Sequence, residues 1–149
     1  MVTEGRVNEP ARQNSSSGLE GAAPLIYVVD DETVLSEMAA VVLRAVGYRV
    51  ETFATGEAAL AAFAQARPHP CLIITDYAMR DMSGLGLLAE CRRAAPGQKV
   101  ILASGTQAEE VYRDVPCKPD RFLAKPYRAR DLIEAVVAVV GRAGEAQGG

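Results

Sequence analysis

The sequence predicts a single α/β domain, in which a doubly wound parallel sheet of five strands carries helices on both faces. Five short apolar runs alternate with segments of helical periodicity, and this alternation is typical of parallel sheets with helical crossovers. The chain has 149 residues, enough for one domain with a core and too few for two ordinary ones. Several of the apolar runs end in charged residues, and such sheets bind ligands beyond the carboxyl ends of their strands.

The composition argues against several functional classes. The chain is 49% hydrophobic and 23% charged, with a net charge of −3. It has no basic stripe for nucleic acid and no polybasic run for an anionic membrane. Its apolar runs are far shorter than the ~20 residues of a membrane span. The three cysteines have neither disulfide-framework nor metal-site spacing, so we expect a reducing cytoplasm.

The two ends of the chain differ from its middle. Residues 1–24 are polar, with a Ser15–Gly18 run, and residues 142–149 are similar. Segments of this composition bury too little apolar surface to offset chain entropy. We therefore expect a disordered tail at each end of a domain formed by residues 25–141, with a docking function for the tails as the alternative.

The first strand is predicted at the apolar run Leu25–Val29. An amphipathic helix follows, and Gly47 ends it. Its apolar stripe, which we expect to face the core, consists of Val34, Leu35, Met38, Val41, Val42 and Ala45. The alternating segment Tyr48–Ala54 then predicts the second strand.

Thr55 is a candidate cap for an alanine-rich helix over Glu57–Ala66, which Pro68 closes. The continuous apolar run Cys71–Thr75 is typical of a strand that is buried on both faces. Ser83 is the next candidate cap, for a helix that continues to about Ala95.

The fourth strand is predicted at Val100–Ala103, followed by a short polar helix over Gln107–Asp114 and an irregular link with two prolines. The last strand is Phe122–Ala124. The last helix is predicted over about Arg128–Gly141, with a stripe of Leu132, Ile133, Val136, Val137 and Val140.

Polar residues end four of the five strands. They are Asp30 and Asp31, Asp76, Ser104 and Lys125, and parallel strands bring these ends to one edge. Carboxylates about 5 Å apart repel by roughly 3 kcal/mol per pair at an effective dielectric constant near 20. A hard cation such as Mg²⁺ relieves that repulsion, and oxygen ligands without His or Cys favour it. A metal, an ammonium group and a hydroxyl that face a carboxylate suit a phosphoryl group.

Each of these residues also has an ordinary interpretation. Asp30 and Asp31 could cap the first helix, Asp76 could begin an Asx-turn, and Lys125 could be a solvated lysine. Their joint placement at successive strand ends favours the functional interpretation.

The chain resembles the receiver domains of bacterial two-component response regulators. The resemblance covers about residues 25–141 and rests on the segments LIYVVDD, LIITDYAMRDMSG, VILASG and FLAKPY. The spacings also fit: 45 residues from Asp31 to Asp76, 28 more to Ser104 and 21 more to Lys125. The link before the last strand is similar to that in receivers of hybrid histidine kinases. The resemblance implies a flavodoxin-like (βα)5 fold.

The resemblance implies a site residue by residue. Asp76 matches the phosphoacceptor, which together with Asp31 binds Mg²⁺ directly. Asp30 matches the acid that holds the metal through water, and Ala78 supplies a backbone carbonyl to it. Lys125 matches the lysine that pairs with a phosphoryl oxygen.

The resemblance also implies a switch. Ser104 matches the hydroxyl that moves to the phosphoryl group, and Phe122 the aromatic residue that then turns inward. Pro126 matches a proline that often follows a cis bond. Arg80 stands where a proline is usual, which loosens a loop, and Gly105 replaces a frequent alanine.

The resemblance implies a phosphorelay switch that accepts a phosphoryl group from a phosphohistidine on a sensor kinase or a phosphotransfer protein. Such a domain catalyses only its own phosphorylation and dephosphorylation. We expect no output domain in this chain, so a downstream protein, still unknown, would read the switch, and a homodimer is possible. One alternative is a receiver fold that binds partners without phosphorylation. The other is a phosphatase of the haloacid dehalogenase type, although Asp30–Thr33 lacks the second Asp of its motif.

Overall fold

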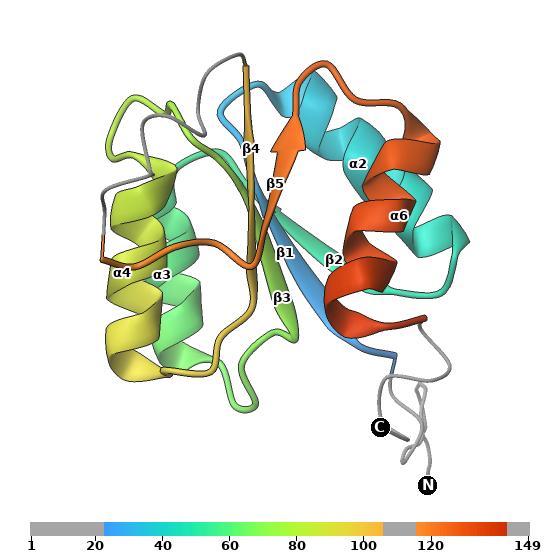
Figure 1. Ribbon diagram of the computed structural model, residues 1–149. Helices are drawn as coiled ribbons and strands as arrows, with labels where there is room; N and C mark the ends of the chain where they lie inside the picture. The colour runs from blue at the N-terminus through green and yellow to red at the C-terminus, as the bar shows by residue number, and fades with distance from the viewer. Residues whose placement is uncertain (1–22, 106–115, 143–149) are drawn as a thin grey trace, which may run out of the picture.

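Figure 1 shows the computed structural model, which describes residues 23–105 and 116–142. Strands and helices alternate along this part of the chain. In order they are β1 (Leu25–Val29), α2 (Thr33–Ala45), β2 (Arg49–Phe53), α3 (Gly56–Gln65), β3 (Leu72–Asp76), α4 (Gly84–Ala94), β4 (Val100–Ser104), β5 (Arg121–Ala124) and α6 (Ala129–Val140). The expected tails and the polar helix at Gln107–Asp114 lie outside the described residues, apart from the few that adjoin the domain.

The five strands form one parallel sheet in the order β2-β1-β3-β4-β5. The predicted doubly wound fold is therefore confirmed. The direction of winding reverses between β1 and β3, and this is the point where sheets of this type place their ligands. Val29 pairs with Thr75, and Asp76 pairs with Ala103, so the ends of β1, β3 and β4 lie level at one edge.

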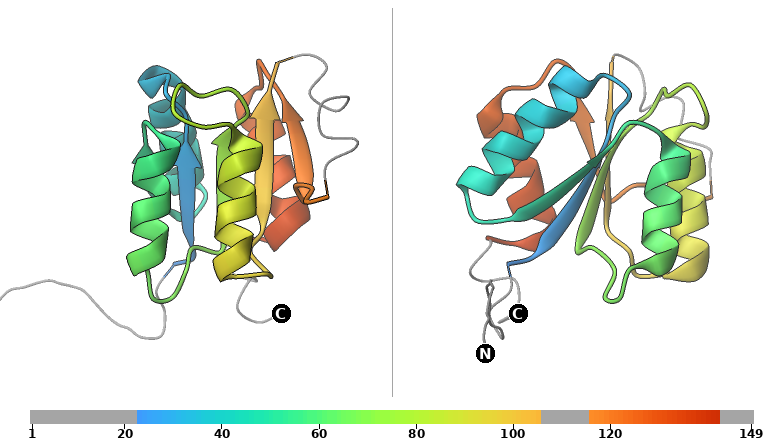
Figure 2. Two further views of the ribbon diagram at one scale, coloured as in Figure 1. Left: turned by 90° about the vertical axis from the view of Figure 1, so that its left-hand side faces the viewer. Right: turned by 180° about the vertical axis from the view of Figure 1, so that it is seen from behind.

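Helices cover both faces of the sheet, α2 and α6 one face and α3 and α4 the other (Figure 2). Successive strand residues serve the two faces in turn. Ile26 and Val28 belong to the core under α2 and α6, whereas Tyr27 and Val29 belong to the core under α3 and α4. A strand that is buried on both faces needs apolar side chains at every position, which explains the continuous apolar runs.

Local signals place the helix ends correctly. The Thr55 hydroxyl accepts a hydrogen bond from the Ala58 amide, and the Ser83 hydroxyl accepts one from the Gly86 amide, each at 3.0 Å. Gly47, which follows α2, has a φ of 106° that side-chain-bearing residues rarely adopt. The predicted boundaries of the strands and helices therefore agree closely with the structure.

The predicted buried face of α2 is wrong. Val34, Met38 and Val41 are 78%, 45% and 63% exposed, and Ala45 is also exposed, while Leu35 and Val42 are half-buried. The face that packs against the sheet and α6 consists of Ser36, Ala39, Ala40 and Leu43. Small side chains allow the helix to approach closely, and the Ser36 hydroxyl donates to the Thr33 carbonyl at 3.1 Å. Close packing therefore outweighs the stronger hydrophobicity of the opposite stripe.

None of the described helices is both long enough and apolar enough to cross a membrane.

Candidate functional site

Three aspartates meet at the carboxyl edge of the sheet. Asp30 and Asp31 follow β1, and Asp76 is the last residue of β3. One carboxylate oxygen from each lies within 4.8 Å of the others. The Asp30 and Asp76 side chains are only 7% and 11% exposed. The donor set is all oxygen and strongly negative, which fits a hard divalent cation such as Mg²⁺.

Lys125 extends from the end of β5 into this cluster. Its ammonium nitrogen lies 3.0 Å from Asp30 Oδ2 and 3.2 Å from Asp76 Oδ1, and Glu32 Oε1 is 3.9 Å away. The Lys125 backbone amide donates to the Ser104 carbonyl at 2.7 Å, which fixes the chain beside β4. The lysine therefore joins carboxylates at the ends of two different strands.

Asp30 is held by the chain around it. Its amide donates to the Phe53 carbonyl at 3.0 Å, and its Oδ1 accepts from the Glu32 amide at 2.9 Å. The N-cap of α2 is Glu32, with no capping side chain. One Asp30 oxygen thus stabilises the turn before α2, and the other contacts Lys125. Asp30 is therefore not the N-cap of α2, which was the alternative interpretation from the sequence.

Burial is the largest cause that raises the pKa of Asp76, and the charges of Asp30 and Asp31 add to it against the opposing attraction of Lys125. For Lys125, burial alone would lower the pKa, but Asp30 and Asp76 outweigh burial and the pKa is raised. The lysine is therefore firmly cationic. One ammonium does not balance three carboxylates, so the remaining negative charge adds to burial in raising the pKa of Asp76.

The other predicted residues lie around this cluster. Ser104 ends β4, next to β3, and is 8% exposed. Ala78 is exposed in the loop after Asp76. Phe122 is half-buried on β5, where it pairs with Leu102. The Lys125–Pro126 bond is cis, as expected from the resemblance.

Sequence reasoning missed three residues at or near the site. Glu32 lies near Lys125. Tyr127 is partly buried, and burial and the Asp30 charge raise its pKa. The Asp81 carboxylate accepts hydrogen bonds from the first turn of α3. Its partners are backbone amides, so no sequence pattern indicates it.

Comparison with known proteins identifies the class. Residues 26–137 match the family model described as the response regulator receiver domain. The probable transcriptional regulatory protein TcrX of Mycobacterium tuberculosis is 32% identical over 126 residues, which are 84% of this chain and 53% of TcrX. The DNA-binding response regulator MtrA of Mycobacterium leprae is 29% identical over 117 residues, 78% of this chain and 51% of MtrA. The chain thus spans about half the length of these curated relatives.

Solved structures agree. The CheY-like receiver domain protein of Methanospirillum hungatei superposes with a TM-score of 0.71 at 28% identity, covering 78% of this chain and 93% of that one. For chemotaxis protein CheY4 of Vibrio cholerae the TM-score is 0.70 at 26% identity, covering 79% and 99%. Fold and site define a signalling domain of the receiver class. This chain belongs to the response regulator receiver family. Receiver domains are generally not metabolic enzymes, so the family does not favour the alternative of a phosphatase of the haloacid dehalogenase type.

Proposed function

We propose that this chain is a phosphorelay switch that accepts a phosphoryl group on Asp76. The observation that carries the proposal is the aspartate cluster, with oxygens within 4.8 Å of one another and the Lys125 ammonium beside Asp30 and Asp76. A carboxylate nucleophile with cationic groups around it suits the transfer of a highly charged phosphoryl group.

We assign Mg²⁺ to this cluster, with Asp31 and Asp76 as direct ligands, Asp30 acting through water, and the Ala78 backbone carbonyl completing the protein donors. The assignment is supported by the all-oxygen donor set and its unbalanced negative charge. When bound, Mg²⁺ supplies positive charge that offsets the charge of the phosphoryl oxygens.

In the transfer step, an Asp76 carboxylate oxygen attacks the phosphorus of a phosphohistidine. The new O–P bond forms as the P–N bond breaks, and the bonding pair returns to the donor imidazole. Lys125 then pairs with a phosphoryl oxygen, and the Ser104 hydroxyl donates to another. The movement of Ser104 opens space into which Phe122 turns, so that a local charge change alters the surface around β5.

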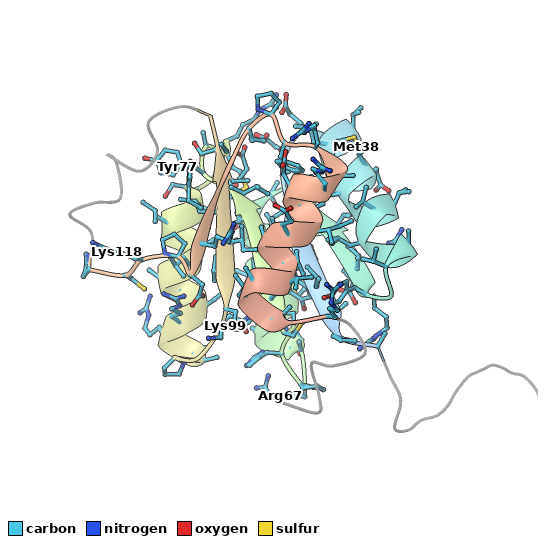
Figure 3. The ribbon with its side chains drawn as sticks, turned by 45° about the vertical axis from the view of Figure 1, so that its right-hand side comes forward. Met38, Arg67, Tyr77, Lys99 and Lys118 are labelled. Carbon is cyan, nitrogen blue, oxygen red and sulfur yellow. The ribbon has the colours of Figure 1, made fainter. Side chains whose placement is uncertain are left out.

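The donor must cover the edge of the sheet to reach Asp76, and we propose a sensor histidine kinase or a phosphotransfer protein. The exposed stripe of Val34, Met38 and Val41 on α2 supports this, because α2 begins next to Asp31. Figure 3 shows Met38 at the same end of the molecule as Tyr77, which follows Asp76, and Arg67 at the opposite end. Apolar side chains beside a charged site suit a protein donor.

A downstream protein, or a second copy of this chain, would read the phosphorylated state. We assign this activity to the cytoplasm, because all three cysteines are free thiols, as is usual in reducing compartments.

The proposal is tested with the full chain, acetyl phosphate and intact-protein mass spectrometry. We expect the mass of one phosphoryl group to be added with Mg²⁺, and no addition with EDTA or in Asp76→Asn. Asp131→Asn is the matched control, since Asp131 lies on α6 and is expected to leave labelling unchanged. Equal labelling of Asp76→Asn would refute the site. A wild-type chain that is never labelled would favour binding without phosphorylation.

A further inference from the structure

The loop between β3 and α4 carries Ala78 and is tied at its base. The Tyr77 amide donates to the Ala103 carbonyl at 2.8 Å, and the Gly84 amide donates to the Tyr77 carbonyl at 2.7 Å. Among the described residues, no backbone–backbone hydrogen bond joins 78–82 to the rest of the protein. Side chains must therefore hold the part of the loop that contains the Ala78 carbonyl.

Asp81 provides the polar anchor. Its Oδ1 accepts from the Gly56 amide at 3.1 Å, and its Oδ2 accepts from the Glu57 amide at 2.8 Å. These amides belong to the first turn of α3, whose N–H groups have no partners within the helix. The positive end of the helix favours the negative carboxylate. One side chain thus joins the loop to α3.

Met82 adds an apolar contact between the loop and α3. It packs so closely on Gly56 that a Cβ added there would lie 2.4 Å from Met82 Cγ. Met79 and Met82 also pack at the edge of the core under α3 and α4. The loop is therefore seated on α3 by one charged contact and by apolar packing.

Asp81 does more than cap α3. Thr55, directly before the helix, caps the Ala58 amide at 3.0 Å, while Asp81 takes the Gly56 and Glu57 amides. Asp81 comes from a segment 25 residues further along the chain, so its additional effect is to restrain the loop. A loop that is already ordered loses less conformational freedom when its carbonyl becomes a ligand.

We propose that Asp81 is a positioning residue of the phosphorylation site, which keeps the loop that carries the Ala78 carbonyl in place before the metal binds. This inference rests on the proposed function, because it concerns the same metal and the same loop. Residues that orient metal ligands typically change metal affinity by 10–100-fold when they are replaced.

The test compares Asp81→Ala with Thr55→Ala in the full chain. Both remove a cap from α3, but only the first releases the loop. We measure the Mg²⁺ dissociation constant by calorimetry, and amide hydrogen exchange of residues 77–84 in metal-free protein. Asp81→Ala is expected to weaken Mg²⁺ binding about tenfold and to accelerate exchange in the loop. Thr55→Ala is expected to do neither, although it lowers the melting temperature. Asp81→Asn keeps one acceptor oxygen, so its Mg²⁺ affinity and loop exchange are expected to lie between those of wild type and Asp81→Ala. If Asp81→Ala does not fold, Asp81→Asn provides the test.

The outcomes separate the two proposals. If wild-type protein binds Mg²⁺ and the Asp81 variants bind it equally well with unchanged loop exchange, the positioning role is wrong and the proposed function stands. Equal weakening in Thr55→Ala would also overturn the positioning role, because the effect would then come from α3 itself. If the wild-type protein binds no Mg²⁺, both proposals fail together.

Discussion

Lys125 is the residue on which the charge balance of the site depends. Its ammonium contacts Asp30 and Asp76, and its side chain is only 16% exposed. Both carboxylates are also largely removed from water, so neither could be left unpaired at little cost. The spacing of acidic and basic strand ends indicated this lysine, because parallel strands bring their ends to one edge whatever the intervening loops do.

Replacing Lys125 by methionine is expected to lower the free energy of unfolding by about 2 kcal/mol in metal-free buffer, the usual range for a lost hydrogen bond to a charged group. Mg²⁺ should restore part of the loss, because it also offsets the carboxylates. Urea unfolding with and without Mg²⁺ measures both effects. Lys99→Met is the control, since Lys99 is half-exposed and 4.0 Å from Asp120. A similar loss in both variants would contradict this account of Lys125.

Asp76 makes the stability depend on pH with a definite sign. Its folded pKa is raised above 3.8, mainly by burial, so the folded chain holds this proton more tightly than the unfolded chain. The ionised carboxylate therefore destabilises the fold at neutral pH, and this effect disappears as the pH falls through the raised pKa towards 3.8.

In metal-free buffer, Asp76→Asn is therefore expected to melt at a higher temperature than wild type at neutral pH, by a margin that narrows on acidification. Thermal melts across that range measure it. For Asp131 the dependence of stability on pH has the opposite sign, because its pKa is lowered, mainly by a hydrogen bond from the Arg128 amide. A lower melting temperature for Asp76→Asn at neutral pH would show that burial does not dominate this carboxyl group.

At the scale of elements, α2 shows where sequence reasoning fails. Periodicity located the helix correctly, but Val34, Met38 and Val41 of the apolar stripe are exposed, and a face of mostly small residues is buried instead. Which face packs depends on how closely a helix fits its neighbours, and hydrophobicity alone does not contain that information.

The contacts of Arg92 were also not predictable from the sequence. Its guanidinium group donates to the Gln98 and Lys118 carbonyls as well as to the Asp120 carboxylate. Backbone carbonyls as acceptors leave no pattern in a sequence.

The two faces of α2 predict two different mutant phenotypes. Leu43→Ala is expected to destabilise the fold by about 2–5 kcal/mol, because Leu43 is fully buried. Met38→Ser is expected to leave stability within about 0.5 kcal/mol. It should also slow phosphotransfer from a histidine kinase while labelling by acetyl phosphate stays unchanged.

Chemical denaturation and parallel labelling assays separate these effects. If Met38→Ser slowed both donors equally, the change would lie in the phosphorylation site, and the exposed stripe would have no part in donor docking.

At the scale of the whole molecule, the strand order makes the site. Because β1 and β3 are neighbours and β4 lies beside β3, residues 46 positions apart, Asp30 and Asp76, become neighbours. The fold and the cluster were predictable because alternation and polar strand ends are local patterns with a fixed spatial consequence. The Asp81 contact was not, because it depends on how one loop folds over one helix.

The most direct test of the central claim is to locate the phosphoryl group. Borohydride reduces an acyl phosphate to an alcohol, so an aspartyl phosphate is converted to homoserine, which peptide mass spectrometry assigns to one position. After reaction with acetyl phosphate and Mg²⁺, we predict homoserine at position 76 and unmodified aspartate at positions 30 and 31. Homoserine at either of those two positions, or at none of the three, would contradict the account.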